Sequence, residues 1–304
     1  MLKHWVLRQN IEKGDKMPIL RRNRKIFTEV FKYIFAFIIL IGTLAPFLWL
    51  IISSISPEKE LLAKPLQWIP SRHTFQRYVS IFTESENNKA AYVFRQAMGN
   101  SIKVALSVVV ISLISGTIAA YSFARLKFRF KNKIIMVFLF TYMIPPVAII
   151  IALFTILNEL NLIDTLLGLT ILYSSFTTPF VVWIMKGYMQ SIPGDLEDAA
   201  RIDGCSRLKA LTRVILPLAL PGLIATGILV FLLSWEEFFY ALIFTSSVQA
   251  KTISVAISEF SGRHAVDYGM IATGGVLATL PPVILTLFFQ RYIISGLTAG
   301  GVKG

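Results

Sequence analysis

Two adjacent carboxylates stand inside an otherwise apolar run, in the segment SWEEFFY of residues 234–240. Ionisable side chains inside a membrane span are energetically costly and usually have a function. Glu236 and Glu237 could hold a proton or accept hydrogen bonds from the hydroxyl groups of a solute, and Trp235 and Phe239 offer aromatic ring faces beside them. The alternative is an interfacial belt of Trp and Tyr in which both carboxylates are solvated.

Other chemistry-bearing residues are few. Further aromatic candidates for the same passage are Tyr142, Phe154, Tyr173 and Phe176, although such residues more often pack than bind. The sequence contains no HExxH, no GxSxG and no phosphate-binding GxxxxGK[ST] motif, so any ATP that is used would be bound by another chain. One cysteine, Cys205, excludes an intramolecular disulfide and a cysteine-based metal site. The histidines, His4, His73 and His264, fall outside the apolar runs.

The elements that must position these residues are membrane spans. The chain has 304 residues, of which 55% are hydrophobic and only 15% charged, whereas a soluble domain carries about 25% charged residues. Apolar runs of about 18 residues or more recur, which is the length that crosses the bilayer as a helix. Residues 1–29 are polar and basic, and the run that begins near Phe31 is too long for a signal peptide, so we expect a retained span.

Six spans are predicted, at residues 31–52, 100–122, 134–157, 166–188, 214–244 and 269–290. Prolines in the third and fifth of them indicate kinked helices that line a passage, or simple packing kinks. At about 1.5 Å per residue along a straight fifth helix, Glu236 lies in the outer half of the membrane or near the outer interface.

The distribution of basic residues orients these spans. With the N-terminus in the cytoplasm, the cytoplasmic segments hold 21 of the 30 Lys and Arg residues and the outer segments hold eight. The positive-inside rule therefore places both termini in the cytoplasm. The net charge of +13 follows mostly from this topology, so it does not indicate an anionic substrate or a nucleic acid.

A polar module, EDAARIDGCSRLKALTRVILPLALP at residues 197–221, separates the fourth and fifth spans. Asp195 can cap a helix whose first turn is acidic, and Glu197 and Arg201 form an i,i+4 pair. Helical spacing places Ala200, Gly204, Leu208 and Leu211 on one face, although a glycine inside a helix favours a turn or a close contact. The module could dock against a cytoplasmic partner or lie on the lipid headgroups.

This stretch resembles the EAA loop of permease subunits in binding-protein-dependent ABC importers. The family pattern is E-A-A, two residues, D-G-A, then an apolar stretch ending in L-P. The matching residues here are Asp198-Ala199-Ala200, Asp203-Gly204-Cys205 and Leu216-Pro217. Asp198 stands where Glu is usual, with Glu197 before it, so a glutamate ion pair could be weaker or shifted to Glu197. Cys205 replaces Ala, and Leu211 stands where Phe is common.

The resemblance extends over about residues 30–304. Pro179-Phe180, Trp183 and Ile192-Pro193 look like the sugar-importer branch, and the tail at 296–304 resembles that of the second permease of maltose-type importers. It implies a type I importer permease with a MetI-like transmembrane domain, which is an all-α membrane protein with six transmembrane helices and a cytoplasmic coupling helix between the fourth and fifth. The expected parts are a basic N-terminal segment (1–29), a transmembrane domain (30–290) with an outer loop (53–99) and a coupling loop (189–213), and a cytoplasmic tail (291–304).

The resemblance also implies site residues. The residues expected to couple to an ATPase subunit are Glu197, Asp198, Ala199, Ala200, Asp203, Gly204, Leu208 and Leu211. Tail residues Gln290, Gly296, Gly300 and Lys303 would reach the ATPase dimer, whereas the alternative is a frayed glycine-rich end. The candidate substrate path consists of Tyr142, Tyr173, Trp235, Glu236, Glu237 and Phe239. Relatives often have Trp-Asn where this chain has Trp235-Glu236, and the acid disfavours an anionic substrate unless a cation of the partner permease pairs with it.

The implied function is the permease subunit of an ATP-driven carbohydrate importer in the bacterial cytoplasmic membrane, not an enzyme and without a cofactor of its own. Its expected partners are a second, homologous permease in a heterodimer, two ATP-binding subunits that hold ATP and magnesium, an extracytoplasmic solute-binding protein, a sugar and the lipid bilayer, but no nucleic acid. Two alternatives remain. A stand-alone ion-coupled transporter would use Glu236 and Glu237 and would need inverted repeats, and a polytopic membrane enzyme would need paired polar groups at matching depth.

Overall fold

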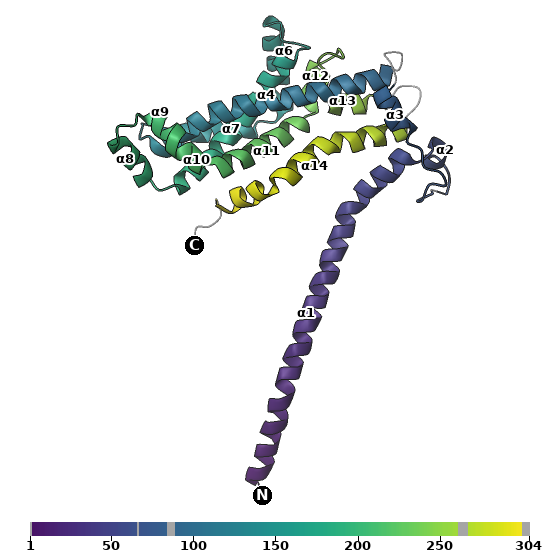
Figure 1. The fold of residues 1–304 in the computed structure, drawn as a ribbon, viewed down its shortest axis with the longest axis vertical. Helices are drawn as coiled ribbons and strands as arrows, with labels where there is room; N and C mark the ends of the chain where they lie inside the picture. Colours follow the sequence, from purple (N-terminus) through teal and green to yellow (C-terminus); the bar gives the residue numbers. More distant parts are fainter. Residues whose placement is uncertain (1, 66, 84–88, 261–266, 300–304) are drawn as a thin grey trace. The chain divides into compact units, whose positions relative to one another are not determined.

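The computed structural model describes residues 2–65, 67–83, 89–260 and 267–299. Every regular element in these ranges is helical, as predicted. The chain divides into two units, residues 1–53 and 54–304, and each is described by itself. In chain order (Figure 1) the helices are α1 (Leu2–Ile55), α2 (Glu58–Leu61), α3 (Gln76–Thr83), α4 (Lys89–Arg125), α5 (Lys131–Met143), α6 (Pro146–Glu159), α7 (Leu166–Ser191), α8 (Asp195–Ile202), α9 (Arg207–Ala210), the π-helical turn η1 (Leu211–Ile215), α10 (Leu216–Leu218), α11 (Leu220–Trp235), α12 (Phe239–Phe244), α13 (Ile253–Ser258) and α14 (Tyr268–Ala299).

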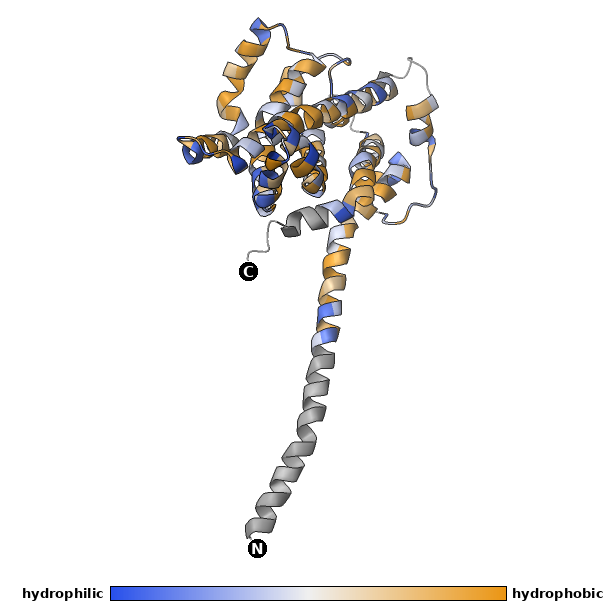
Figure 2. Cartoon of the chain, turned by 60° about the vertical axis from the view of Figure 1, so that its left-hand side comes forward, coloured by the Kyte–Doolittle hydropathy of each residue, from blue (hydrophilic) through white to orange (hydrophobic). Residues whose placement is uncertain are grey.

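Within the described ranges, four helical segments are long and apolar enough to cross a membrane, and two bent helix pairs pass the same test together. The four are Thr28–Ile55, Ala90–Arg125, Leu166–Ser191 and Tyr268–Tyr292. The pairs are Lys131–Thr141 with Pro146–Glu159 and Arg207–Leu218 with Leu220–Trp235. If each pair is one span, the chain has the six spans that the sequence predicts. Hydrophobic residues predominate along the long helices of residues 89–260 and 267–292 (Figure 2), and many of their large apolar side chains are exposed, which suits contact with lipid or with other membrane helices.

The bends have local causes. α5 and α6 meet at 92°, because Ile144 is extended before Pro145 and Pro146 begins the next helix. α10 and α11 meet at 79°, beside the π-helical turn η1 and two prolines, Pro217 and Pro221. The kinks expected from the prolines of the third and fifth spans are therefore present, but the fifth span predicted at 214–244 is not a single helix. α11 ends at Trp235, and the short helix α12 follows it, so Glu236 lies beyond a helix end.

The packing core of residues 54–299 is the pair of α4 and α7, which run side by side (Figure 1). Val104 and Val108 of α4 and Val181 and Met185 of α7 are fully buried in it. Gly116 permits the close approach, because a Cβ built there would lie 2.6 Å from Val181 Cγ1. A second cluster joins α4, α11, α13 and α14. The two clusters hold together the helices that carry the candidate site.

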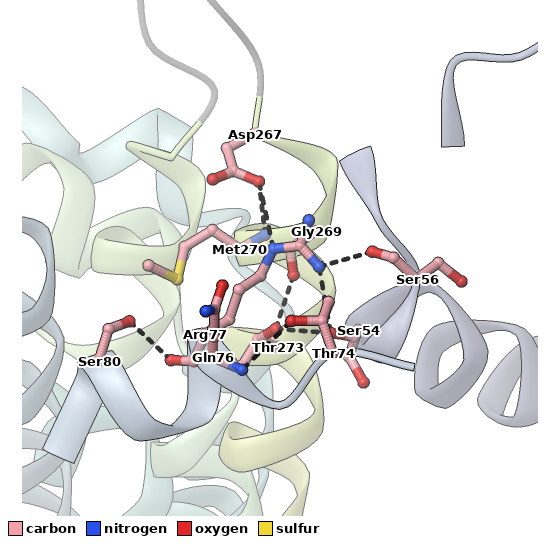
Figure 3. Close-up of polar contacts among 10 residues, drawn as sticks. All are labelled: Ser54, Ser56, Thr74, Gln76, Arg77, Ser80, Asp267, Gly269, Met270 and Thr273. Atoms are coloured by element: carbon pink, nitrogen blue, oxygen red, sulfur yellow. Dashed lines mark hydrogen bonds and ion pairs between the residues drawn. The ribbon is translucent and has the colours of Figure 1, made fainter. Parts of the chain in front are cut away.

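A clasp around Arg77 orders the segment between α1 and α4 (Figure 3). The Arg77 guanidinium donates hydrogen bonds to the carbonyls of Ser54, at 3.3 Å, and Ser56, at 2.8 Å, and pairs with Asp267 at 3.9 Å. It also lies against Gly269, where no Cβ would fit. The clasp holds α3 against the start of α14, so this part of the predicted outer loop is folded.

The loops before α7 and after α12 are joined by Asp164. One Asp164 carboxylate oxygen accepts the backbone N–H groups of Ser246 and Ser247 at 2.8 and 2.9 Å, and the Asp164 N–H donates to the Phe244 carbonyl at 2.9 Å. Burial alone would raise the pKa of Asp164, but these N–H donors outweigh it and hold the pKa below its ordinary value of 3.8.

This lowered pKa makes the loop junction sensitive to acid. A carboxyl whose pKa is lower in the folded state contributes stability above its unfolded pKa, and that contribution disappears as the pH falls through the folded-state value. We therefore expect Asp164→Asn to lower the free energy of unfolding by about 1 kcal/mol at neutral pH and to have no effect well below the folded-state pKa. Because asparagine also tolerates the positive φ of 56° found here, the variant tests the charge. Thermal unfolding in detergent, at neutral pH and at a pH well below the folded-state pKa, measures the change in stability. An equal loss of stability at the two pH values would show that the Asp164 charge does not stabilise the junction.

Candidate functional site

The polar module between α7 and α11 begins with the helix α8. Gly194 is the N-cap of α8. The predicted cap, Asp195, is instead the first helical residue. Asp195, Glu197 and Asp198 do lie in the first turn as expected, where negative charge offsets the helix dipole. The predicted start of the helix is therefore confirmed, but the N-cap lies one residue earlier than predicted.

The module is not one continuous helix. Gly204 has a φ of +84°, which glycine adopts without strain, and it ends α8 before α9 begins at Arg207. The single face predicted for Ala200, Gly204, Leu208 and Leu211 therefore does not form. Ala200 and Leu211 are buried, whereas Gly204 and Leu208 are exposed.

Glu197 ties α8 to the spans. Its side chain is buried, one carboxylate oxygen accepts a hydrogen bond from the Tyr121 hydroxyl at 2.5 Å, and the other lies 3.3 Å from Arg125 Nε. Arg125 also donates to the carbonyl of Ile192, the C-cap of α7, at 2.8 Å. The predicted i,i+4 pair with Arg201 is replaced by this longer-range one, and Arg201 is exposed. Glu197, Tyr121 and Arg125, the anchor triad, fix α8 to the ends of α4 and α7.

The outward side of the module presents acidic and apolar groups together. The exposed members of the predicted coupling set are Asp198, Ala199, Asp203, Gly204 and Leu208. Ile202 is 86% exposed and Leu208 67%, although both are apolar and lie in the most polar part of the chain. Apolar side chains left uncovered beside carboxylates are typical of a surface that contacts a protein partner or a membrane.

The predicted tail residues belong to the end of α14. Gln290 is exposed, and the helix continues through Gly296 to Ala299, so residues 291–299 are helical. Gly300 and Lys303 lie outside the described residues.

The predicted substrate-path residues separate into different surroundings. Trp235 is buried, stacks on Phe231, and donates its indole N–H to the Ala278 carbonyl at 3.1 Å, so it joins α11 to α14. Glu236 is exposed. Phe239 is half-buried and packs against Tyr240. Tyr142 belongs to α5, and its side chain is not among those that the structure describes.

Glu237 and Tyr173 lie in the most enclosed part of this region. Both Glu237 carboxylate oxygens accept backbone N–H groups at the start of α12, from Tyr240 at 2.9 Å and Ala241 at 3.2 Å. Tyr173 is fully buried, and its hydroxyl lies near the Glu237 carboxylate. Tyr173 packs on Phe176, which stacks on Tyr240.

A cavity of about 1040 Å³ opens beside these residues, between α4, α5, α6, α7 and the start of α12. Most of its lining is apolar, and its polar and aromatic members are Phe138, Thr141, Ser174, Ser175, Phe176, Thr178, Glu237 and Tyr240. Because Ser174–Thr178 occupy the middle of the α7 span, the cavity reaches the depth at which a solute would cross. Trp235, Glu236 and Phe239 do not line it.

Comparison with known proteins decides the family. A family model described as the inner membrane component of binding-protein-dependent transport systems matches residues 112–298. The chain belongs to this family. It is 34% identical over 273 residues to the permease SmoH of a sulfoquinovosyl glycerol transport system of Agrobacterium fabrum, covering 90% of this chain and 93% of that protein. It is also 34% identical over 281 residues to the permease MalG of a trehalose/maltose transport system of Thermococcus litoralis, covering 92% and 99%.

The fold is that of solved importers. A chain of a bacterial ABC transporter involved in the import of the acidic polysaccharide alginate matches with a TM-score of 0.75 at 22% identity, over 89% of this permease and 98% of that chain. The prediction of an importer permease is thereby confirmed, and it is favoured over the stand-alone ion-coupled transporter.

Two features of the permease site were missed from the sequence. Ser174, Ser175 and Thr178 line the cavity, and a signal existed for them, because the hydroxyl cluster SSFTT interrupts an apolar span just before Pro179. Arg125 as the partner of Glu197 had no such signal, because 72 residues separate the two in the chain.

Proposed function

We propose that this permease forms half of the passage of an ATP-driven carbohydrate importer and couples that passage to ATPase subunits. The observation that carries the proposal is the anchor triad with the uncovered surface next to it. The triad binds α8 to the ends of α4 and α7, while Ala199 and Ile202 of α8 and Leu208 of α9 are exposed. A helix with this arrangement can receive a partner and pass its movement to two spans. The trehalose/maltose and sulfoquinovosyl glycerol systems of the relatives support a sugar as the solute.

In this proposal α8 is the coupling helix, and Asp198, Ala199, Asp203, Gly204 and Leu208 face the ATPase subunit. Glu197, Ala200 and Leu211 support the helix from within. The end of α14, from Gln290 and Gly296 toward Gly300 and Lys303, reaches the ATPase dimer. ATP and magnesium are held by the ATPase subunits, so this chain hydrolyses nothing and needs no cofactor of its own.

The assembly we propose has two permeases and two ATPase subunits. The second permease is a homologue, and the two pair through membrane faces. An extracytoplasmic solute-binding protein delivers the sugar to the outer loops. The basic loop from Arg125 to Lys133 supports a cytoplasmic location for this side of the membrane, and both termini lie on that side of the bacterial cytoplasmic membrane.

Ala199→Arg tests the docking role of α8. Ala199 is exposed, so arginine should fold normally there but obstruct a closely apposed partner. We expect the purified wild-type complex to contain an ATPase and a second permease, and the variant to lose the ATPase, by at least tenfold in band intensity, while it keeps the second permease. Affinity purification from detergent extracts, followed by mass spectrometry, measures both.

The matched control is Gln76→Arg, an equally exposed helical position on α3, which the proposed topology places on the other side of the membrane. It should retain both partners. Purification of the wild-type chain without an ATPase, or equal retention of the ATPase by both variants, would show that α8 is not the docking element.

A further inference from the structure

We propose that the cavity beside α7 binds an uncharged sugar and that Glu237 excludes anionic sugars from it. The inference rests on the proposed function and adds the class of substrate. Small-molecule sites have volumes of about 300 to 1000 Å³, so about 1040 Å³ is enough for a sugar of two or three units.

The hydroxyl groups of the lining suit a polyhydroxylated ligand. Ser175 Oγ donates to the Leu172 carbonyl at 2.6 Å, and Thr141 Oγ1 donates to Phe138 at 2.7 Å. Their hydrogens are thus used within their own helices, which leaves oxygen lone pairs to accept from a ligand. Ser174 is 8% exposed, and its Oγ has no partner among the described residues. A buried hydroxyl without a partner is unfavourable, and a ligand hydroxyl would satisfy it.

The aromatic lining suits the ring of a sugar. Phe176 and Tyr240, from α7 and α12, both line the cavity, and their rings are stacked with centroids 6.1 Å apart and planes 20° from parallel. The C–H face of a pyranose packs against aromatic carbon through dispersion. An anion or a small polar solute without an apolar face would gain nothing from these rings.

The charge of the lining sets the preference. Among the described residues that line the cavity, Glu237 carries the only charge, and none is cationic. Two backbone N–H groups hold its carboxylate in place, and the remaining lone pairs can accept sugar hydroxyls. A carboxylate or sulfonate on the ligand would meet a like charge in surroundings of low dielectric constant. We therefore expect this cavity to prefer uncharged sugars, whereas the sulfoquinovosyl glycerol and alginate systems of the similar proteins carry anionic ones.

Cysteine labelling tests both the access of water and the charge. Cys205→Ala removes the only cysteine, and Ser174→Cys then places a thiol in the cavity lining. In membranes that contain the full importer, we expect a cationic methanethiosulfonate to modify Cys at this position roughly tenfold faster than an anionic one. Glu237→Gln should remove that difference, and the matched control Glu236→Gln, which alters an exposed carboxylate outside the lining, should keep it.

Protection by sugars tests the ligand class without altering Glu237. Trehalose or maltose should slow the modification at least tenfold, whereas sulfoquinovosyl glycerol and an alginate oligosaccharide should not. No reaction with either reagent would mean that lipid or a partner helix fills the cavity. The absence of any reaction would overturn the inference. It would also be overturned if the two reagents reacted at equal rates, if an anionic sugar protected the cysteine, or if no neutral sugar did.

The proposed function is tested separately by ATP-dependent uptake of labelled trehalose and maltose into cells that carry the importer. If ATP-dependent uptake is observed but the labelling results contradict a sugar site in the cavity, this inference alone is overturned. Loss of the ATPase from the purified wild-type complex would overturn the proposed function itself.

Discussion

We expect Arg125→Ala to abolish transport and to lower the free energy of unfolding of the permease by about 3 kcal/mol or more. The Arg125 and Glu197 side chains are 15% and 10% exposed, and removal of one partner of a buried ion pair leaves the other charge uncompensated. The variant also loses the hydrogen bond to the Ile192 carbonyl, so of the triad's contacts only the Tyr121–Glu197 hydrogen bond still holds α8 to α4. Thermal unfolding in detergent and uptake in cells measure the two effects.

Three further variants separate the contributions to the triad. Arg129→Ala removes a neighbouring but exposed arginine and should change neither quantity. Tyr121→Phe removes only one hydrogen bond and should cost about 1 to 2 kcal/mol. Glu197→Gln keeps an acceptor for Tyr121 and removes the charge, so its effect should lie between those of Tyr121→Phe and Arg125→Ala. If Arg125→Ala behaved like Arg129→Ala in both assays, the triad would have no part in holding α8.

A second large effect is expected from a single methyl group in α4. Gly116→Ala places a Cβ 2.6 Å from Val181 Cγ1 and 2.7 Å from Val181 Cβ, which is closer than side-chain atoms can pack. Val181 is fully buried and has no room to move aside, so α4 and α7 must separate. We expect a loss of about 2 kcal/mol in the free energy of unfolding, measured by thermal unfolding in detergent.

The same helix provides the control. Gly99 has no atom within 4 Å of where a Cβ would stand, and alanine is the better helix former by about 0.5 to 1 kcal/mol. Gly99→Ala should therefore stabilise the permease slightly while Gly116→Ala destabilises it. Stabilisation by both substitutions would show that helix propensity, and not the contact between α4 and α7, dominates at Gly116.

Local rules predicted the helices and part of the coupling module. The lengths of the apolar runs gave six candidate spans, because crossing the bilayer requires a minimum length whatever the neighbours are. The acidic first turn of α8 followed from the helix dipole, and Gly204 was recognised as a turn candidate from its conformational cost. These inferences depend on residues within a few positions of each other.

Which way a side chain faces could not be predicted in the same manner. Glu197 and Asp198 are adjacent and similar, yet Glu197 is buried against Arg125 and Asp198 is exposed, because the direction depends on where α4 passes. The break after Trp235 was missed for a related reason. The run from 214 to 244 contains no charged residue except Glu236 and Glu237. Its break coincides with contacts from distant or later residues, namely the packing of Trp235 against α14 and the hydrogen bonds of Glu237 to the start of α12.

Cys205 has a practical consequence for following the movement of this permease. It is the only cysteine of the chain, it is partly exposed, and it follows Gly204 in the turn between α8 and α9. A nitroxide or fluorophore attached to it would therefore report from the coupling module of the otherwise unaltered protein. Two such labels in an assembly that held two copies of this chain, or one label and one on an ATPase subunit, would give spectroscopic distances that track the module through the ATP cycle.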